Sequence, residues 1–164
     1  MESIKYIAPI LAFLMLGACK KDKLTGLRSI FVGEWEWVYS KKFTNYTTPP
    51  FASTEDTIFA TNLSTTYSLN FIEKGKIQLI ENGNVQSEYR TVFSTFSNEG
   101  NCLGILSNPY EFSIDLDNDE DHWMNGCVST DSLSLSYDFP FPKEQSTNTT
   151  ITYRHCFKTV SYTH

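Results

Sequence analysis

The residues best suited to covalent chemistry in this sequence are its cysteines and histidines. Cys156 directly follows His155, and a thiol activated by an imidazole is a common nucleophile. Neighbouring side chains on a β-strand point to opposite faces, however, so we do not expect this pair to be catalytic. His122, His155 and His164 lack the spacing of metal ligands, and the chain has no G-x-S-x-G, P-loop or H-E-x-x-H motif. The sequence therefore predicts neither an enzyme nor a metal or cofactor site.

Cys19 follows an uncharged and almost wholly apolar run, Tyr6–Ala18. The run is shorter than the roughly 20 apolar residues that a membrane-spanning helix needs, and it suits a secretory signal. Its end, Leu16-Gly17-Ala18-Cys19, resembles the lipobox of bacterial lipoproteins. The resemblance implies cleavage before Cys19, with lipid on its sulfur and its new amino group. Residues 1–18 would then be a signal peptide and residues 19–29 the lipidated cysteine and its tether.

A lipidated Cys19 would attach the mature protein to a membrane of the bacterial cell envelope. Two or more acyl chains anchor a protein stably, so no spanning segment is needed. Position 20 is Lys rather than Asp, and by resemblance to other lipoproteins this favours the outer membrane. An ordinary signal peptide or an apolar amino-terminal helix is the alternative, and the side of the membrane stays open.

Three cysteines remain once Cys19 carries lipid. An exported protein meets oxidising conditions, so one disulfide is expected. Cys102 and Cys127 flank a predicted hairpin at 110–125, which favours this pair and leaves Cys156 over. Three free buried cysteines are the alternative.

A run of acidic residues between positions 115 and 121 has the alternate carboxylates that suit calcium. An EF-hand loop starting at Asp115 would need Gly at position 120 and Glu at position 126, but the residues there are Glu120 and Gly126. We therefore expect an exposed acidic turn, with a weak calcium site as the alternative. The acidic residues are Asp115, Asp117, Asp119, Glu120 and Asp121.

Composition limits the protein classes further. The chain has 164 residues and 18.8 kDa, which is enough for one domain. Apolar residues make up 40% and aromatic residues 15%, so most of the chain should be folded. The net charge of −6 argues against nucleic-acid binding, which needs a basic surface.

Alternating apolar residues and frequent turn signals predict an all-β domain over residues 30–160. Eight or nine antiparallel strands with mostly short turns fit an up-and-down barrel or a curled sheet, and closure of a barrel removes exposed edges. The expected strands are Glu34–Tyr39, Tyr67–Phe71, Lys76–Glu81, Val85–Thr95, Cys102–Ser107, Tyr110–Leu116, His122–Val128, Ser132–Asp138 and Thr149–Thr159.

Two expected turns, Lys74-Gly75 and Asn82-Gly83, set the register of the central hairpins. A two-residue turn at each place puts Ile72 and Ile77 on the outer face. The inner face then holds Leu69, Phe71, Ile80, Val85 and Tyr89.

The exception to short turns is the segment Phe43–Glu55, which is rich in Thr and Pro and is expected to be a long loop. This loop and a second one near Phe139 and Phe141 carry several aromatic residues. At one end of a barrel they would form an apolar rim, with the first loop as a lid. The alternative is that these rings cap the core.

Several short motifs follow one another along the chain: Gly33-x-Trp35, the Asn82-Gly83 turn, Asp131-x-Leu133-x-Leu135, and Tyr153-x-His155 around Arg154. In this order they resemble the lipocalin-like domain of bacterial lipoproteins. The resemblance implies a barrel whose base is closed by Gly33, Trp35 and Arg154, with the guanidinium packed on the indole ring.

The leading functional hypothesis is a lipid-anchored barrel that binds a small apolar ligand non-covalently. The alternative is an interaction or structural envelope lipoprotein with a filled barrel, since an eight-stranded barrel is only just wide enough for either. No cofactor is expected, and the oligomeric state stays open. The residues expected to line the ligand site are Leu69, Phe71, Tyr89, Phe112, Leu133, Tyr137 and Tyr153.

Overall fold

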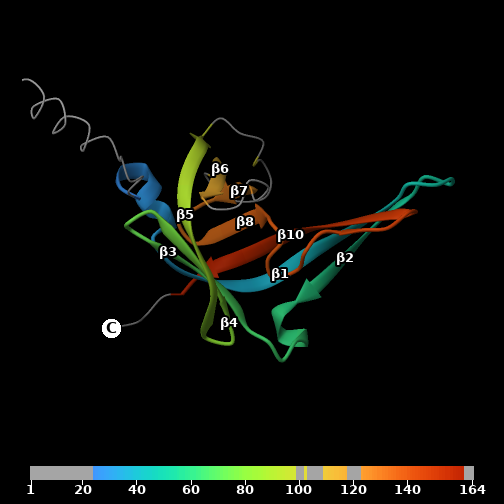
Figure 1. The fold of residues 1–164 in the computed structure, drawn as a ribbon, viewed down its shortest axis with the longest axis horizontal. Coiled ribbons are helices and arrows are strands. Elements are labelled where there is room, and N and C mark those ends of the chain that lie inside the picture. Colours follow the sequence, from blue (N-terminus) through green and yellow to red (C-terminus); the bar gives the residue numbers. More distant parts are fainter. Residues whose placement is uncertain (1–23, 99–101, 103–108, 118–122, 161–164) are drawn as a thin grey trace, which may run out of the picture.

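A computed structural model describes residues 24–98, 102, 109–117 and 123–160. These residues form one antiparallel sheet with two short 3₁₀ helices (Figure 1). The helices are η1 (Gly26–Phe31) and η2 (Ala60–Asn62). The strands are β1 (Gly33–Tyr46), β2 (Ser53–Phe59), β3 (Tyr67–Ile72), β4 (Lys76–Glu81), β5 (Asn84–Ser97), β6 (Tyr110–Asp117), β7 (Trp123–Val128), β8 (Ser132–Ser136), β9 (Glu144–Gln145) and β10 (Thr149–Thr159).

The sheet closes into an antiparallel barrel of eight strands, in the order β1-β3-β4-β5-β6-β7-β8-β10. Pairing of β1 with β10 completes the ring and extends from Trp35↔Thr159 to Tyr46↔Thr149. The expectation of a closed antiparallel barrel is therefore confirmed. Closure leaves no free edge within the ring, which protects the strands from pairing with other chains. The expected strand Cys102–Ser107 lies, apart from Cys102, outside the described residues.

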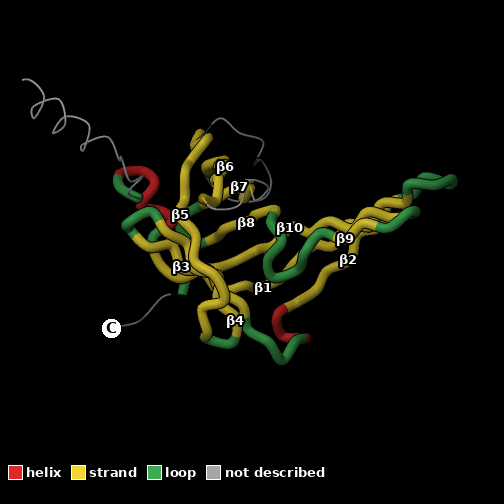
Figure 2. The backbone as a smooth tube through the Cα atoms, viewed as in Figure 1, coloured by secondary structure: helices red, strands yellow, loops and turns green. Residues whose placement is uncertain are grey.

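A projecting arm, residues 41–59 and 144–154, continues beyond the barrel. Strand β3 pairs with β1 only from Gly33 to Glu36, and β8 pairs with β10 only from His155 to Lys158. The rest of the β1–β10 ladder extends past the ring and carries β2 and β9 on its two sides (Figure 2). The expected loop at Phe43–Glu55 is wrong, because β1 and β2 pair on both sides of its short tip.

Helix η1 lies at the base of the barrel, ahead of β1. The chain passes from η1 into β1 through Gly33, whose φ of 125° is open to glycine and strained for other residues. Just before the helix, Leu24 is buried, and its backbone N–H donates to Glu73 O in the β3–β4 turn. These contacts hold the amino-terminal end of the described chain against the base.

The β3–β4 hairpin differs from the expected register by one residue. Phe71 pairs with Ile77 and Leu69 pairs with Leu79, so the turn includes one residue more than the expected Lys74-Gly75. A one-residue shift reverses the faces of a strand. The expected inward residues Ile80 and Val85 are therefore wrong: Val85 is 52% exposed, whereas Ile77 is fully buried.

Two local features of the strands shape the barrel wall: a register shift in β1 and a close approach of β8 to a glycine on β7. The register of the β1–β10 ladder shifts between Trp37 and Tyr39, and the shift turns both Trp37 and Ser40 into the interior. On β7, Gly126 faces β8 so closely that an added Cβ would lie 2.0 Å from Ser134 O. Only glycine fits there without moving a strand.

Candidate functional site

The interior of the described barrel is filled by large apolar side chains. Of the seven residues expected to line a ligand site, Leu69, Phe71, Phe112 and Leu133 are buried in the core. The other three are half-buried: Tyr89 and Tyr137 pack against the core, and Tyr153 lies at the barrel mouth. The largest fully buried side chains are Trp35, Trp37, Phe31, Phe71, Phe112, Phe157, Leu24, Leu69, Ile77, Ile114, Leu116 and Met124.

Phe31 from η1 closes the base of the barrel. Its ring lies 4.9–6.0 Å, centroid to centroid, from Phe71, Phe93, Phe96 and Phe112, which come from three strands. Such tilted and edge-on contacts stabilise aromatic clusters. The sequence does not indicate this role for Phe31, because its neighbours Ile30 and Val32 are also apolar and no pattern shows which side chain points into the barrel.

Trp35 lies at the base, as the resemblance to the lipocalin-like domain implied. It is fully buried, and its indole Nε1–H donates to Phe31 O at 2.8 Å. The expected partner Arg154 is elsewhere: it is exposed and pairs with Lys41 on the arm, whereas Trp35 pairs with Thr159. The expected packing of Arg154 on Trp35 is therefore wrong. The cation at the base is Arg28 of η1, whose guanidinium carbon lies 4.8 Å from the centre of the Phe93 ring.

The barrel mouth is capped by rings from the segment between β8 and β9. Phe141 lies 5.5 Å from Trp37 and 5.4 Å from Tyr153, and Phe139 lies 5.5 Å from Tyr67, all between ring centroids. The aromatic residues Phe43, Tyr46 and Phe51 are on the arm instead. The two sets do not meet in one rim, so the expected lid is wrong and the mouth is closed by the second segment alone.

A buried hydrogen-bond chain links β1, β10 and the end of β8. The Trp37 indole Nε1–H donates to Ser40 Oγ at 2.9 Å, and Ser40 Oγ lies 2.6 Å from His155 Nδ1. His155 Nε2 lies 2.9 Å from Tyr137 O, which can only accept. Nε2 therefore carries the ring proton, and Ser40 donates to Nδ1.

His155 is held neutral by this arrangement. Burial lowers the pKa of His155 to about 4 from an ordinary value of 6.5, against smaller opposing effects of the Tyr137 carbonyl and the Asp138 charge. A serine beside a histidine is the start of a nucleophilic site, but here both residues are fully buried and both serve as internal partners. Ser40 and His155 are 115 residues apart, and no local signal in the sequence could have paired them.

The Cys102–Cys127 disulfide is present, with a Cα–Cα distance of 5.9 Å. It joins Cys102, which lies between β5 and β6 in the sequence, to the outer side of β7. Cys156 is a free, half-buried thiol on the outer side of β10, 3.9 Å from Ser134 Oγ. A hydrogen bond with Cys156, together with burial, raises the pKa of Tyr39 to about 12.

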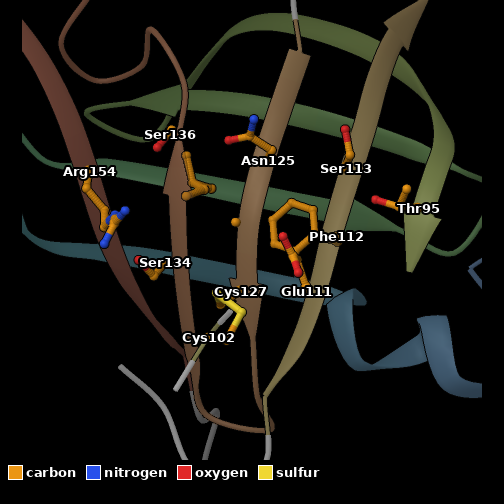
Figure 3. Close-up of a pocket in the computed structure, with 12 residues that line it drawn as sticks. Thr95, Cys102, Glu111, Phe112, Ser113, Asn125, Cys127, Ser134, Ser136 and Arg154 are labelled. Atoms are coloured by element: carbon orange, nitrogen blue, oxygen red, sulfur yellow. A yellow bond between two sulfur atoms is a disulfide. The ribbon is translucent and has the colours of Figure 1, made fainter. Parts of the chain in front are cut away.

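A polar hollow of about 390 Å³ lies on the outer wall of the barrel, across β5, β6, β7, β8 and β10. Figure 3 shows Glu111, Asn125, Ser136 and Arg154 around it, with the disulfide at its lower end. Exposed and buried residues alternate along these strands, so this face is opposite to the filled interior. Arg154 makes no hydrogen bond or ion pair with the described part of the chain.

Several expected features fall outside the described residues. They are Cys19 with residues 1–23, His122, His164 and the acidic residues Asp119, Glu120 and Asp121. Within the described ranges, His, Cys, Asp and Glu side chains form no group of three that could hold a metal ion. In the same ranges, no helix has the length and apolar character needed to cross a membrane.

Compared with protein-family models, with curated proteins and with solved structures, the chain matches none.

Proposed function

We propose that this protein is a lipid-anchored bacterial envelope protein with a lipocalin-like barrel, and that it acts by binding a partner rather than by catalysis. The lipid on Cys19 would hold it at a membrane, most simply the outer membrane. The barrel would serve as a rigid scaffold that holds the projecting arm, and the arm would bind a protein partner in the envelope.

The filled interior is the observation that carries this proposal. Phe31 occupies the base and Phe139 and Phe141 the mouth, while the space between is packed with core side chains. Three hollows in the described part of the chain are each lined in part by exposed residues of the outer wall, the rim or the arm. This packing favours an interaction protein over a carrier that encloses a small apolar ligand.

The position of the arm supports the same proposal. Helix η1 and the arm tip lie at opposite ends of the long axis (Figure 1). Cys19 is five residues ahead of Leu24, which is fixed at the base. An anchor at Cys19 would therefore leave the arm directed away from the membrane.

The arm also has a surface that can bind an extended segment. Strand β2 is the last strand on its side of the sheet, and six of its seven residues are exposed. A partner strand can add to such an edge through main-chain hydrogen bonds. Phe59 and the tip residue Phe51 are 48% and 76% exposed and would add apolar contact.

Site-specific photo-crosslinking of the full lipidated chain in its own host tests the proposal. A photoreactive residue at Phe51 or Phe59 should give one discrete protein adduct, and the same residue at Val92 on the outer wall of β5 should not. Cys19→Ala should release the protein from the membrane fraction. Equal crosslinking from all three positions would contradict binding by the arm.

Native mass spectrometry of the full chain distinguishes the rival hypothesis. An empty barrel is expected. A co-purified small apolar molecule would overturn the proposal in favour of a ligand-binding barrel.

A further inference from the structure

A notch lies where β8 ends and β10 continues into the arm. It has a volume of about 410 Å³ and is lined by the start of β7, the end of β8, the segment after β8 and the middle of β10. It shares Asn125 and Ser136 with the hollow on the outer wall. A third hollow on the arm, of about 470 Å³, shares Thr152 with the notch and Arg154 with the outer wall. The three hollows therefore adjoin one another around the base of the arm, and we refer to them together as the groove.

The groove exists because its floor has small side chains. Asn125 pairs with Ser136 across β7 and β8, and Ser113 pairs with Asn125 from the other side. These short polar groups leave room above the sheet, which longer side chains would fill. Figure 3 shows them side by side on the wall, with Arg154 at one margin.

The walls of the notch combine aromatic rings with side chains that donate hydrogen bonds and side chains that accept them. Trp123 is 50% exposed although it is a large apolar side chain, and Tyr153 is half-buried. Tyr153 is fixed by a hydrogen bond from its hydroxyl to Glu144 Oε1 at 3.3 Å. Asp138 Oδ1 accepts a hydrogen bond from the Lys143 backbone N–H at 3.1 Å. This bond closes the turn that carries the two charged side chains, Asp138 and Lys143.

This combination fits one class of ligand. A mainly apolar ligand would leave the hydroxyl and amide groups of the floor without partners. A polyanion such as a nucleic acid is disfavoured by the net charge of −6 and by Asp138 in the wall. A pyranose ring presents an apolar C–H face that stacks on an indole and a rim of hydroxyls that both donate and accept. Three adjoining hollows suit several linked sugar units.

We propose that this groove binds a neutral oligosaccharide, with a sugar ring stacked on Trp123 and its hydroxyls bound by Asn125, Ser136 and Thr152. The inference goes beyond the proposed function, because it requires neither the lipid anchor nor a protein partner of the arm. Binding is non-covalent, and no group is transferred.

Binding of three defined probes to the full chain tests the inference: maltotetraose, cellotetraose and tetra-N-acetylchitotetraose. At least one should bind with millimolar or tighter affinity, measured by calorimetry. Trp35 and Trp37 are buried, so acrylamide quenching reports mainly on Trp123, and the bound sugar should protect it. Failure of all three probes to bind at about 10 mM would overturn the inference.

Four variants locate the binding. Trp123→Ala should weaken it about tenfold or more, and Trp123→Phe should retain part of it. Ser136→Tyr should block it by filling the notch, since Ser136 is exposed and its replacement leaves the core intact. Leu27→Ala, at a 67% exposed apolar residue on η1, is the matched control and should bind as the native protein does. Binding that neither Trp123→Ala nor Ser136→Tyr weakens would place the sugar elsewhere and overturn the inference.

Discussion

His155 combines full burial with a titratable ring. Its folded pKa of about 4 lies below the ordinary value of 6.5, and burial is the main cause. Between these two pH values His155 binds a proton in the unfolded chain but stays neutral in the folded chain. Titration of His155 therefore leaves the free energy of unfolding independent of pH above 6.5 and lowers it as the pH drops towards 4.

The prediction for this residue is a loss of stability in acid that depends on the imidazole. From pH 7.5 to pH 4.5, His155 should lower the free energy of unfolding by about 2–3 kcal/mol. His155→Gln keeps a polar side chain that does not titrate, so this variant should not show the part of the fall in unfolding free energy that His155 causes. Urea unfolding of both proteins at the two pH values measures the difference. Equal losses in the two proteins would contradict the assignment.

The sequence shows which types of residue the site contains, but it does not show which of them come into contact. The resemblance to the lipocalin-like domain implied Trp35 at the base, and the flanking of a predicted hairpin favoured the Cys102–Cys127 pair; the structure has both. The contact of Ser40 with His155 depends on how the two ends of the chain close the barrel and on the register shift in β1. Neither feature has a local sequence signal.

Among the elements, the strands that bury one face were the ones that the sequence could locate. β10 occupies the expected residues Thr149–Thr159, because His155 and Phe157 alternate there with outward residues. β2 was missed since it has no buried side chain: it is an edge strand held by main-chain pairing with β1. Alternation of apolar residues cannot reveal a strand that contributes nothing to the core.

The register of β4 shows a different limit. Both of its faces carry apolar residues, so the hydrophobic pattern fits two registers that differ by one residue. The turn decides between them, and the turn used here is longer than the two-residue form.

A matched pair of substitutions tests this register. Leu79 is 5% exposed and Val85 is 52% exposed, whereas the two-residue turn would bury Val85. Leu79→Ala should lower the free energy of unfolding by about 2–4 kcal/mol by leaving a cavity. Val85→Ala should change it by less than about 0.5 kcal/mol. Urea titrations compare them, and a larger loss for Val85→Ala would favour the other register.

At the scale of the whole molecule, the barrel and the arm are stabilised in different ways. The barrel depends on a core closed at both ends by aromatic rings. The arm depends on main-chain ladders, with few buried side chains and one exposed ion pair, Lys41 with Glu55 at 2.7 Å. Exposed ion pairs contribute little, so changes in the arm should scarcely affect the barrel.

The same substitution at two places tests this division. Phe31→Ala removes the ring at the centre of four aromatic contacts in the base and should lower the free energy of unfolding by about 3–5 kcal/mol. Phe51→Ala removes a ring that is 76% exposed at the arm tip and should change it by less than about 0.5 kcal/mol. Thermal and urea unfolding, followed by near-ultraviolet circular dichroism, measure both. Comparable losses at the two positions would mean that the arm tip packs on the barrel, and the arm could then not be an independent binding element.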